Sequence, residues 1–164
     1  MKKIILLTTF AILLFNNNAC TGYKPIYNSS NFNIKIENYS VKGNKRLATL
    51  IYTKLYNISL SNKNNMNVRS INLSIETNKE KKSTVKNSAG KVLEYEININ
   101  TKIIIDNYLT EKRILDQNFD YSTSYKVQDE HSETIKLENK NIENLLNKTY
   151  EDVLIKISEV MTTQ

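Results

Sequence analysis

The chain shows two kinds of apolar periodicity. Strict alternation of apolar and polar positions is typical of a half-buried strand, and it occurs in four stretches. Recurrence at intervals of three and four places an apolar stripe along one side of a helix, and it occurs in two stretches. The predicted elements in chain order are a strand at 32–41, a helix at 47–58, strands at 66–75, 93–105 and 115–127, and a helix at 140–161.

The third strand carries the clearest pattern. From Leu93 to Ile105 apolar side chains line one face and charged or amide side chains line the other, so one face is predicted to meet water. The short polar segment 106–111 joins this strand to the next as a hairpin. The phase of the first strand changes near Asn38, which predicts an irregularity there. The polar, lysine-rich segment 77–88 is predicted to be a long turn.

These elements predict an α+β fold. We expect a two-layer sandwich in which two amphipathic helices lie on one face of a four-stranded, mainly antiparallel sheet. The order is β-α-β-β-β-α, and each helix covers half of the same face. The predicted domain spans 32–164.

The first twenty residues form a different kind of segment. Lys2 and Lys3 precede an apolar run from Ile4 to Phe15, which has the length of a signal-peptide core and is shorter than the roughly 20 residues of a membrane-spanning helix. We interpret 1–19 as a signal peptide and 20–31, which holds the single proline, as a linker. A helix that crosses the membrane is not predicted.

Cys20 is the only cysteine and directly follows Ala19. A thiol at the end of an apolar signal is the site at which bacterial lipoproteins are acylated, and several acyl chains on one residue give a stable anchor, since each buried CH₂ contributes about 0.8 kcal/mol. The alternative is an ordinary residue beside an ordinary cleavage site. Asn17 fits neither kind of site well, and we favour lipidation of Cys20.

The charge of +6 is spread unevenly. All acidic residues follow the signal, so the mature chain is only mildly basic. Export makes nucleic acid an improbable partner, and the anions of a Gram-negative envelope are phosphorylated glycolipids. The densest basic segment is the predicted turn, and we consider it either a site for an anionic headgroup or a solvated loop. Its lysines are Lys79, Lys81, Lys82, Lys86 and Lys91.

The residues needed for catalysis are scarce. His131 is the only histidine and lies in a polar segment that predicts a solvated loop or a helix start. One histidine and one cysteine cannot supply an ordinary transition-metal site. A nucleophile elbow of the Gly-x-Ser-x-Gly type is absent from the sequence. We therefore expect no enzymatic activity, no metal and no cofactor apart from the lipid on Cys20.

One motif resembles a known family. The segment Cys20-Thr21-Gly22-Tyr23-Lys24-Pro25-Ile26-Tyr27 is similar to the Cys-Gly-Phe-Arg-Pro-Leu-Tyr start of alphaproteobacterial lipopolysaccharide-assembly lipoproteins of the LptE type, with Thr21 as an additional residue. The order of predicted elements is also that of the family.

The resemblance implies a role without catalysis. Family members sit in the lumen of the LptD β-barrel, plug it, and assist insertion of lipopolysaccharide into the outer leaflet. It implies an outer-membrane protein anchored through Cys20 and facing the periplasm, with the barrel and lipopolysaccharide as partners. It transfers no lipopolysaccharide-contacting residue to this chain. The alternative is another small envelope lipoprotein that acts as a lipid- or protein-binding adapter.

Overall fold

The computed structural model describes residues 33–61 and 68–162. Its elements are β1 (Ile34–Gly43), α2 (Lys45–Ser61), β2 (Arg69–Lys86), β3 (Val92–Asn107), β4 (Arg113–Lys126) and α3 (His131–Thr162). The predicted order β-α-β-β-β-α is confirmed. The signal, Cys20 and the linker, together with the predicted strand residues Phe32 and Met66, lie outside the described residues.

The four strands form one mixed sheet in the order β1-β2-β3-β4. β1 runs parallel to β2, whereas β2–β3 and β3–β4 are antiparallel hairpins. The expected sheet, mainly antiparallel, is therefore confirmed. The predicted irregularity in the first strand is also present, because the register shifts between Ile36 and Asn38.

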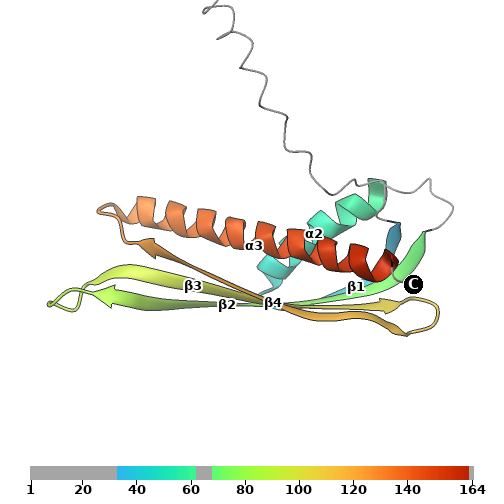
Figure 1. Cartoon of the computed structure of the whole chain (residues 1–164). Coiled ribbons are helices and arrows are strands. Elements are labelled where there is room, and N and C mark those ends of the chain that lie inside the picture. Colours follow the sequence, from blue (N-terminus) through green and yellow to red (C-terminus); the bar gives the residue numbers. More distant parts are fainter. Residues whose placement is uncertain (1–32, 62–67, 163–164) are drawn as a thin grey trace, which may run out of the picture.

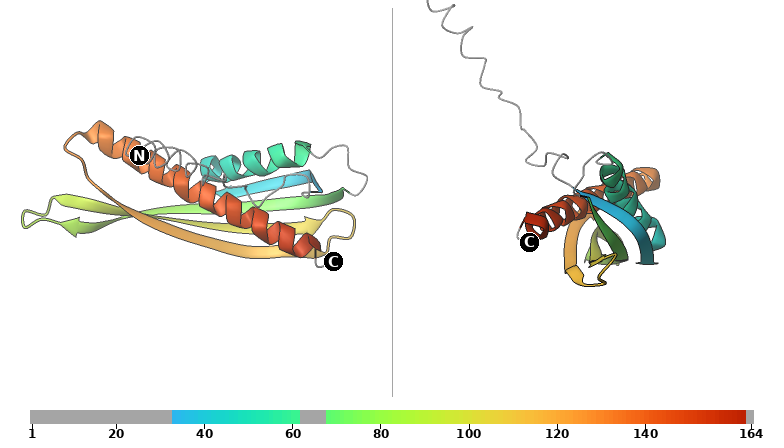
Figure 2. Two further views of the ribbon diagram at one scale, coloured as in Figure 1. Left: turned by 45° about the horizontal axis from the view of Figure 1, so that its top comes forward. Right: turned by 90° about the vertical axis from the view of Figure 1, so that its right-hand side faces the viewer.

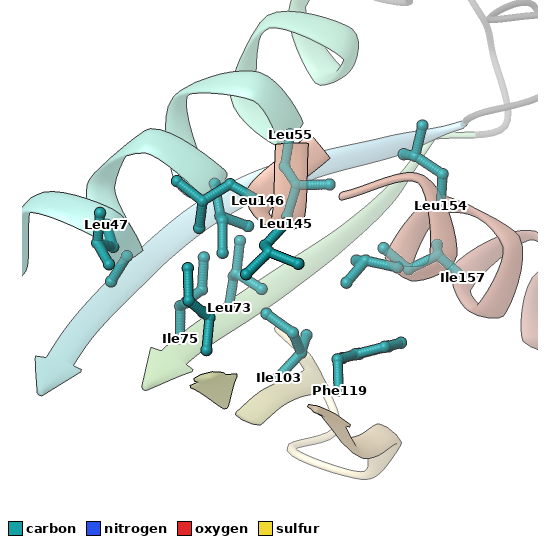
Figure 3. Close-up of a cluster of buried hydrophobic side chains, with 14 of the residues drawn as sticks. Leu47, Leu55, Leu73, Ile75, Ile103, Phe119, Leu145, Leu146, Leu154 and Ile157 are labelled. Atoms are coloured by element: carbon teal, nitrogen blue, oxygen red, sulfur yellow. The ribbon is translucent and has the colours of Figure 1, made fainter. Parts of the chain in front are cut away.

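Both helices pack on the same face of the sheet (Figure 1). α2 covers β1 and β2, and α3 crosses β3 and β4, as expected. Figure 3 shows how Leu55 of α2 and Leu145 of α3 meet strand residues such as Leu73 and Ile103 between the layers. The strand side of this core consists largely of isoleucine, a β-branched residue that packs well on a pleated surface. The strand isoleucines with no exposed surface are Ile71, Ile75, Ile97, Ile99, Ile103 and Ile105.

The connection from β1 to α2 requires a glycine. Gly43 has a φ of 68°, and a Cβ at this position would lie 2.4 Å from the carbonyl oxygen of Thr77. The next residue, Asn44, donates its backbone N–H to the same oxygen at 2.6 Å. Its side-chain oxygen accepts a hydrogen bond from the backbone N–H of Leu47 at 3.3 Å, so Asn44 caps the start of α2.

Two boundary predictions are wrong. The segment 77–88 is not a long turn, because β2 continues to Lys86 and pairs with β3 along this whole length. The second helix begins at His131 and not at 140. Both additions lie toward one end of the molecule, where the β2–β3 hairpin runs past the beginning of α3 (Figures 1 and 2). Fewer side chains are covered there, so the apolar pattern that reveals an element in a sequence is weak.

Candidate functional site

The five lysines of the basic segment lie on a β-hairpin, and its pleat divides them. Successive residues of a strand point to opposite faces. Lys79 and Lys81 continue the helix-facing row of Ile75 and Thr77, whereas Lys82 lies on the opposite face. Lys86 ends β2, and Lys91 lies in the turn before β3. The structure therefore does not bring the five side chains together into one site.

Lys79 and Lys81 bind a carboxylate of α3. The ammonium of Lys79 donates to Oε1 of Glu138 at 3.1 Å, and that of Lys81 donates to Oε2 at 2.6 Å. The hydroxyl of Tyr125 on β4 donates to the same Oε2 at 2.9 Å. Lys81 also lies 4.1 Å from the ring centroid of Tyr95, within range of a cation–π contact. These two lysines hold α3 against the sheet.

The ionisation of Glu138 reflects this environment. Burial by itself would raise its pKa, but the hydrogen bonds from Lys81, Tyr125 and Lys79 outweigh burial and lower the pKa to about 2. For Lys81, whose charged form is a cation, burial lowers the pKa. The hydrogen bonds with Glu138 and Tyr125 outweigh burial, so the pKa of Lys81 is raised. Glu138 therefore stays ionised and remains paired with both lysines at and around neutral pH.

Lys82 is paired in a different way. Its ammonium lies 3.1 Å from a carboxylate oxygen of Glu80, its neighbour on the outer face, and both side chains are well exposed. Exposed ion pairs contribute little to stability and exchange readily with water or with another ion. The position of Lys82 matches the solvated alternative considered for the basic segment.

Lys86 and Lys91 remain at the tip of the hairpin, and neither forms an ion pair with another residue of the described ranges 33–61 and 68–162. The turn between them is well defined: the side-chain oxygen of Asn87 accepts from the backbone N–H groups of Ala89 and Lys91, at 3.0 and 2.9 Å. Two apolar side chains flank the turn, Val85 and Leu93, which are 43% and 41% exposed. We call Val85, Lys86, Lys91 and Leu93 the hairpin tip.

The hairpin tip can hold an anion beside an apolar group. An ammonium without a carboxylate partner is available to a phosphate or another carboxylate. Exposed aliphatic side chains next to it offer contact to hydrocarbon. This pairing of properties is that of a surface for a phosphorylated amphiphile. The sequence predicted a basic segment but could not show which lysines Glu138 binds, because Glu138 lies far away in the chain.

His131 is the exposed first residue of α3, in agreement with the predicted helix start. Within residues 33–61 and 68–162, no group of three His, Cys, Asp or Glu side chains is arranged to hold a metal. No helix in these ranges is long and apolar enough to cross a bilayer.

The comparisons with known proteins give a match only at the level of structure. No family model matches the sequence, and no curated protein matches it. The structure is similar to a lipoprotein from Caulobacter crescentus, with a TM-score of 0.57 and 11% identity over 82% of this chain and 94% of that chain. It is also similar to rare lipoprotein B from Shewanella oneidensis, with a TM-score of 0.54 and 13% identity over 77% and 97% of the two chains.

A third structure agrees with these two. Lipoprotein B from Nitrosomonas europaea matches with a TM-score of 0.53 and 13% identity, over 87% of this chain and 94% of that chain. The chain has the rare lipoprotein B, or LptE-like, fold. At these identities the likeness concerns the fold alone. The rare lipoprotein B fold gives no site residue to this chain, so the hairpin tip rests on its own geometry.

Proposed function

We propose that this protein is an outer-membrane lipoprotein that assembles with an LptD-type β-barrel, plugs its lumen, and assists insertion of lipopolysaccharide into the outer leaflet. The observation that carries the proposal is the agreement of two independent features. The segment from Cys20 to Tyr27 resembles the start of LptE-type lipoproteins, and the described domain has the fold of rare lipoprotein B. Acylation of Cys20 would tether the domain to the membrane.

The outer face of the sheet supports a position inside a barrel. This face carries a network of amide, hydroxyl and carboxylate side chains: Asn38 donates to Asn72 at 3.1 Å, and Asn98 donates to Asp120 at 2.6 Å. A hydroxyl pair, Ser40 and Ser74, lies between the same two strands as the first amide pair. The lumen of an outer-membrane barrel is polar and lined with water. A polar face of this kind suits contact with that wall.

The hairpin tip supports the lipopolysaccharide part of the proposal. Lipid A carries phosphate groups next to acyl chains, and the tip combines the cations Lys86 and Lys91 with the exposed apolar side chains Val85 and Leu93 in one short segment. Lys79 and Lys81 play no direct part in this contact, because Glu138 binds both. Lys82 contributes only long-range attraction.

The direct test is copurification. The full-length protein with a C-terminal tag is isolated from outer membranes solubilised in a mild detergent. We expect one large β-barrel protein to accompany it in stoichiometric amount. A tagged protein recovered as a free monomer would contradict the proposal and would favour the adapter role.

A second experiment tests the anchor by itself. Cys20→Ser removes the sulfur that receives the lipid, so the variant should lose its mass increment for acyl chains and should no longer sediment with membranes. A matched control is Ser29→Ala, which lies in the same linker and leaves Cys20 intact. Acylation that persists in the Cys20→Ser variant would refute the assignment of Cys20.

A further inference from the structure

A groove separates the two helices on the side away from the sheet. It has a volume of about 360 Å³ and is bounded by one face of α2 and one face of α3. Its lining residues are Arg46, Leu50, Ile51, Lys54, Asn139, Ile142, Glu143, Leu146 and Asn147. Each wall spans nine residues, and the eight steps between them, at 1.5 Å each, make the groove about 12 Å long. We call it the helix groove.

The floor of the helix groove is apolar. Ile51, Ile142 and Leu146 are almost fully buried and belong to the core. Leu50 stands higher in the wall and is 44% exposed, whereas Leu47, Ile51 and Leu55 of the same helix are buried. Apolar surface in water is unfavourable in proportion to its area. A hydrocarbon chain lying along the floor would remove Leu50 from water.

The two walls carry opposite charges that do not meet. Arg46 on α2 and Glu143 on α3 form no ion pair with each other or with any other residue that the structure describes. Lys54 donates to the amide oxygen of Asn147, a neutral group, and its ammonium lies 5.5 Å from the ring centroid of Tyr150. α2 holds three cations, Lys45, Arg46 and Lys54, and no acidic residue. The α2 wall therefore offers cations to an anion, and the α3 wall offers one carboxylate to a cation.

We propose that the helix groove binds a phospholipid whose headgroup carries both a phosphate and a primary ammonium, as phosphatidylethanolamine does. Arg46 donates to the phosphate, because a guanidinium matches two phosphate oxygens at once. Glu143 accepts from the ammonium. One acyl chain lies on the floor beside Leu50 and Ile142. The site is separate from the hairpin tip and needs neither the barrel nor lipopolysaccharide, so this inference goes beyond the proposed function.

The charges of the two walls select this ligand. A volume of about 360 Å³ is at the lower end of small-molecule pockets, so the groove accommodates one acyl chain and any further chain lies outside it. A purely anionic headgroup would leave Glu143 without a partner and facing a negative charge. A quaternary ammonium has no N–H to donate. The primary ammonium is the headgroup that satisfies both walls.

The test uses photo-crosslinking from a membrane. The full-length protein is reconstituted into phosphatidylcholine vesicles that contain a lipid with a diazirine in its acyl chain, either phosphatidylethanolamine or phosphatidylglycerol. After illumination, labelled peptides are identified by mass spectrometry. We expect label on peptides covering 45–61 and 139–147, with more from the ethanolamine lipid than from the glycerol lipid. Equal labelling by the two lipids would overturn the proposal.

Two variants with matched controls sharpen the test. Glu143→Gln should lower the ratio of ethanolamine to glycerol labelling about two- to fivefold, as expected for one exposed charge contact. Glu151→Gln, on an exposed position of the same helix, should leave it unchanged. Leu50→Asp should abolish labelling in the groove, whereas Leu109→Asp, at a side chain 83% exposed in the β3–β4 turn, should not. Labelling unchanged by Leu50→Asp in a folded protein would also overturn the proposal.

Discussion

The two ends of the β2–β3 hairpin have the same backbone pairing but different surroundings. At the covered end, Ile75 pairs with Ile103 and both side chains are fully buried under the helices. At the other end, Ser83 pairs with Tyr95 and the strands then shift register twice before the turn. The covered end supplies the core, whereas the projecting end supplies exposed cations and apolar groups. The difference teaches that a single regular element can combine a structural half with an exposed half, to which we assign ligand binding as part of the proposed function.

The largest expected effect on stability comes from a comparison of a buried and an exposed side chain on the same face of β3. Ile103→Ala removes a fully buried side chain and should lower the free energy of unfolding by about 2–5 kcal/mol. Leu93→Ala, on the same face of β3 but 41% exposed, should lower it by less than about 1 kcal/mol. Urea unfolding followed by circular dichroism measures both. Equal losses would show that the projecting end is packed as tightly as the covered end.

A smaller loss of unfolding free energy is expected at Glu138, which contacts the hairpin between its covered and its projecting end. Glu138→Gln keeps the shape of the side chain but leaves Lys79 and Lys81 without their carboxylate, which should cost about 1–3 kcal/mol. The control is Glu133→Gln, which breaks an exposed pair with Lys136 near the start of the same helix. This change should have almost no effect, because exposed pairs contribute little. A loss no greater than that of the control would mean that Glu138 does not fasten α3 to the hairpin.

The same carboxylate should make stability depend on pH. The pKa of Glu138 lies at about 2 in the folded protein and at its ordinary value of 4.5 when unfolded, so its stabilisation is complete above about pH 4.5 and is lost as the pH falls toward 2. Hydrogen bonds from Lys35 and Ser70 also lower the pKa of Glu37, which acts in the same direction. Urea midpoints measured from neutral to acidic pH should therefore fall less steeply in Glu138→Gln. An unchanged slope would contradict the assigned pKa.

Sequence periodicity could predict the covered parts of the fold. The isoleucines of β2 and β3 alternate with polar residues, and the leucines of both helices recur at intervals of three and four, because these side chains point into the core. The order of the elements follows from that pattern. The last part of β2 and the first part of α3 could not be predicted. Residues 79–86 and 131–138 bury few apolar side chains, so they show little apolar periodicity. The lysine-rich segment could be recognised from the sequence, whereas the binding of Lys79 and Lys81 by Glu138 required the fold. Cys20 lies outside the described residues, and its role stays a prediction.

The smallest effect on stability should accompany the largest effect on binding. Lys86→Glu with Lys91→Glu changes two exposed side chains that have no ion-pair partner among residues 33–61 and 68–162. The folded state should keep its unfolding free energy within about 0.5 kcal/mol. Thermal or urea unfolding of this double variant is the check, and a larger loss would mean that the hairpin tip also has a structural role.

Binding of purified lipopolysaccharide is the measurement that tests the division of the hairpin most directly. The full-length protein and the Lys86→Glu, Lys91→Glu double variant are titrated with lipopolysaccharide, beside a control with Lys82→Glu, which changes the charge of an exposed lysine on the outer face. The account predicts that the double variant loses binding by about tenfold or more, and that the control loses far less. Equal affinity of the double variant and the unaltered protein would contradict it.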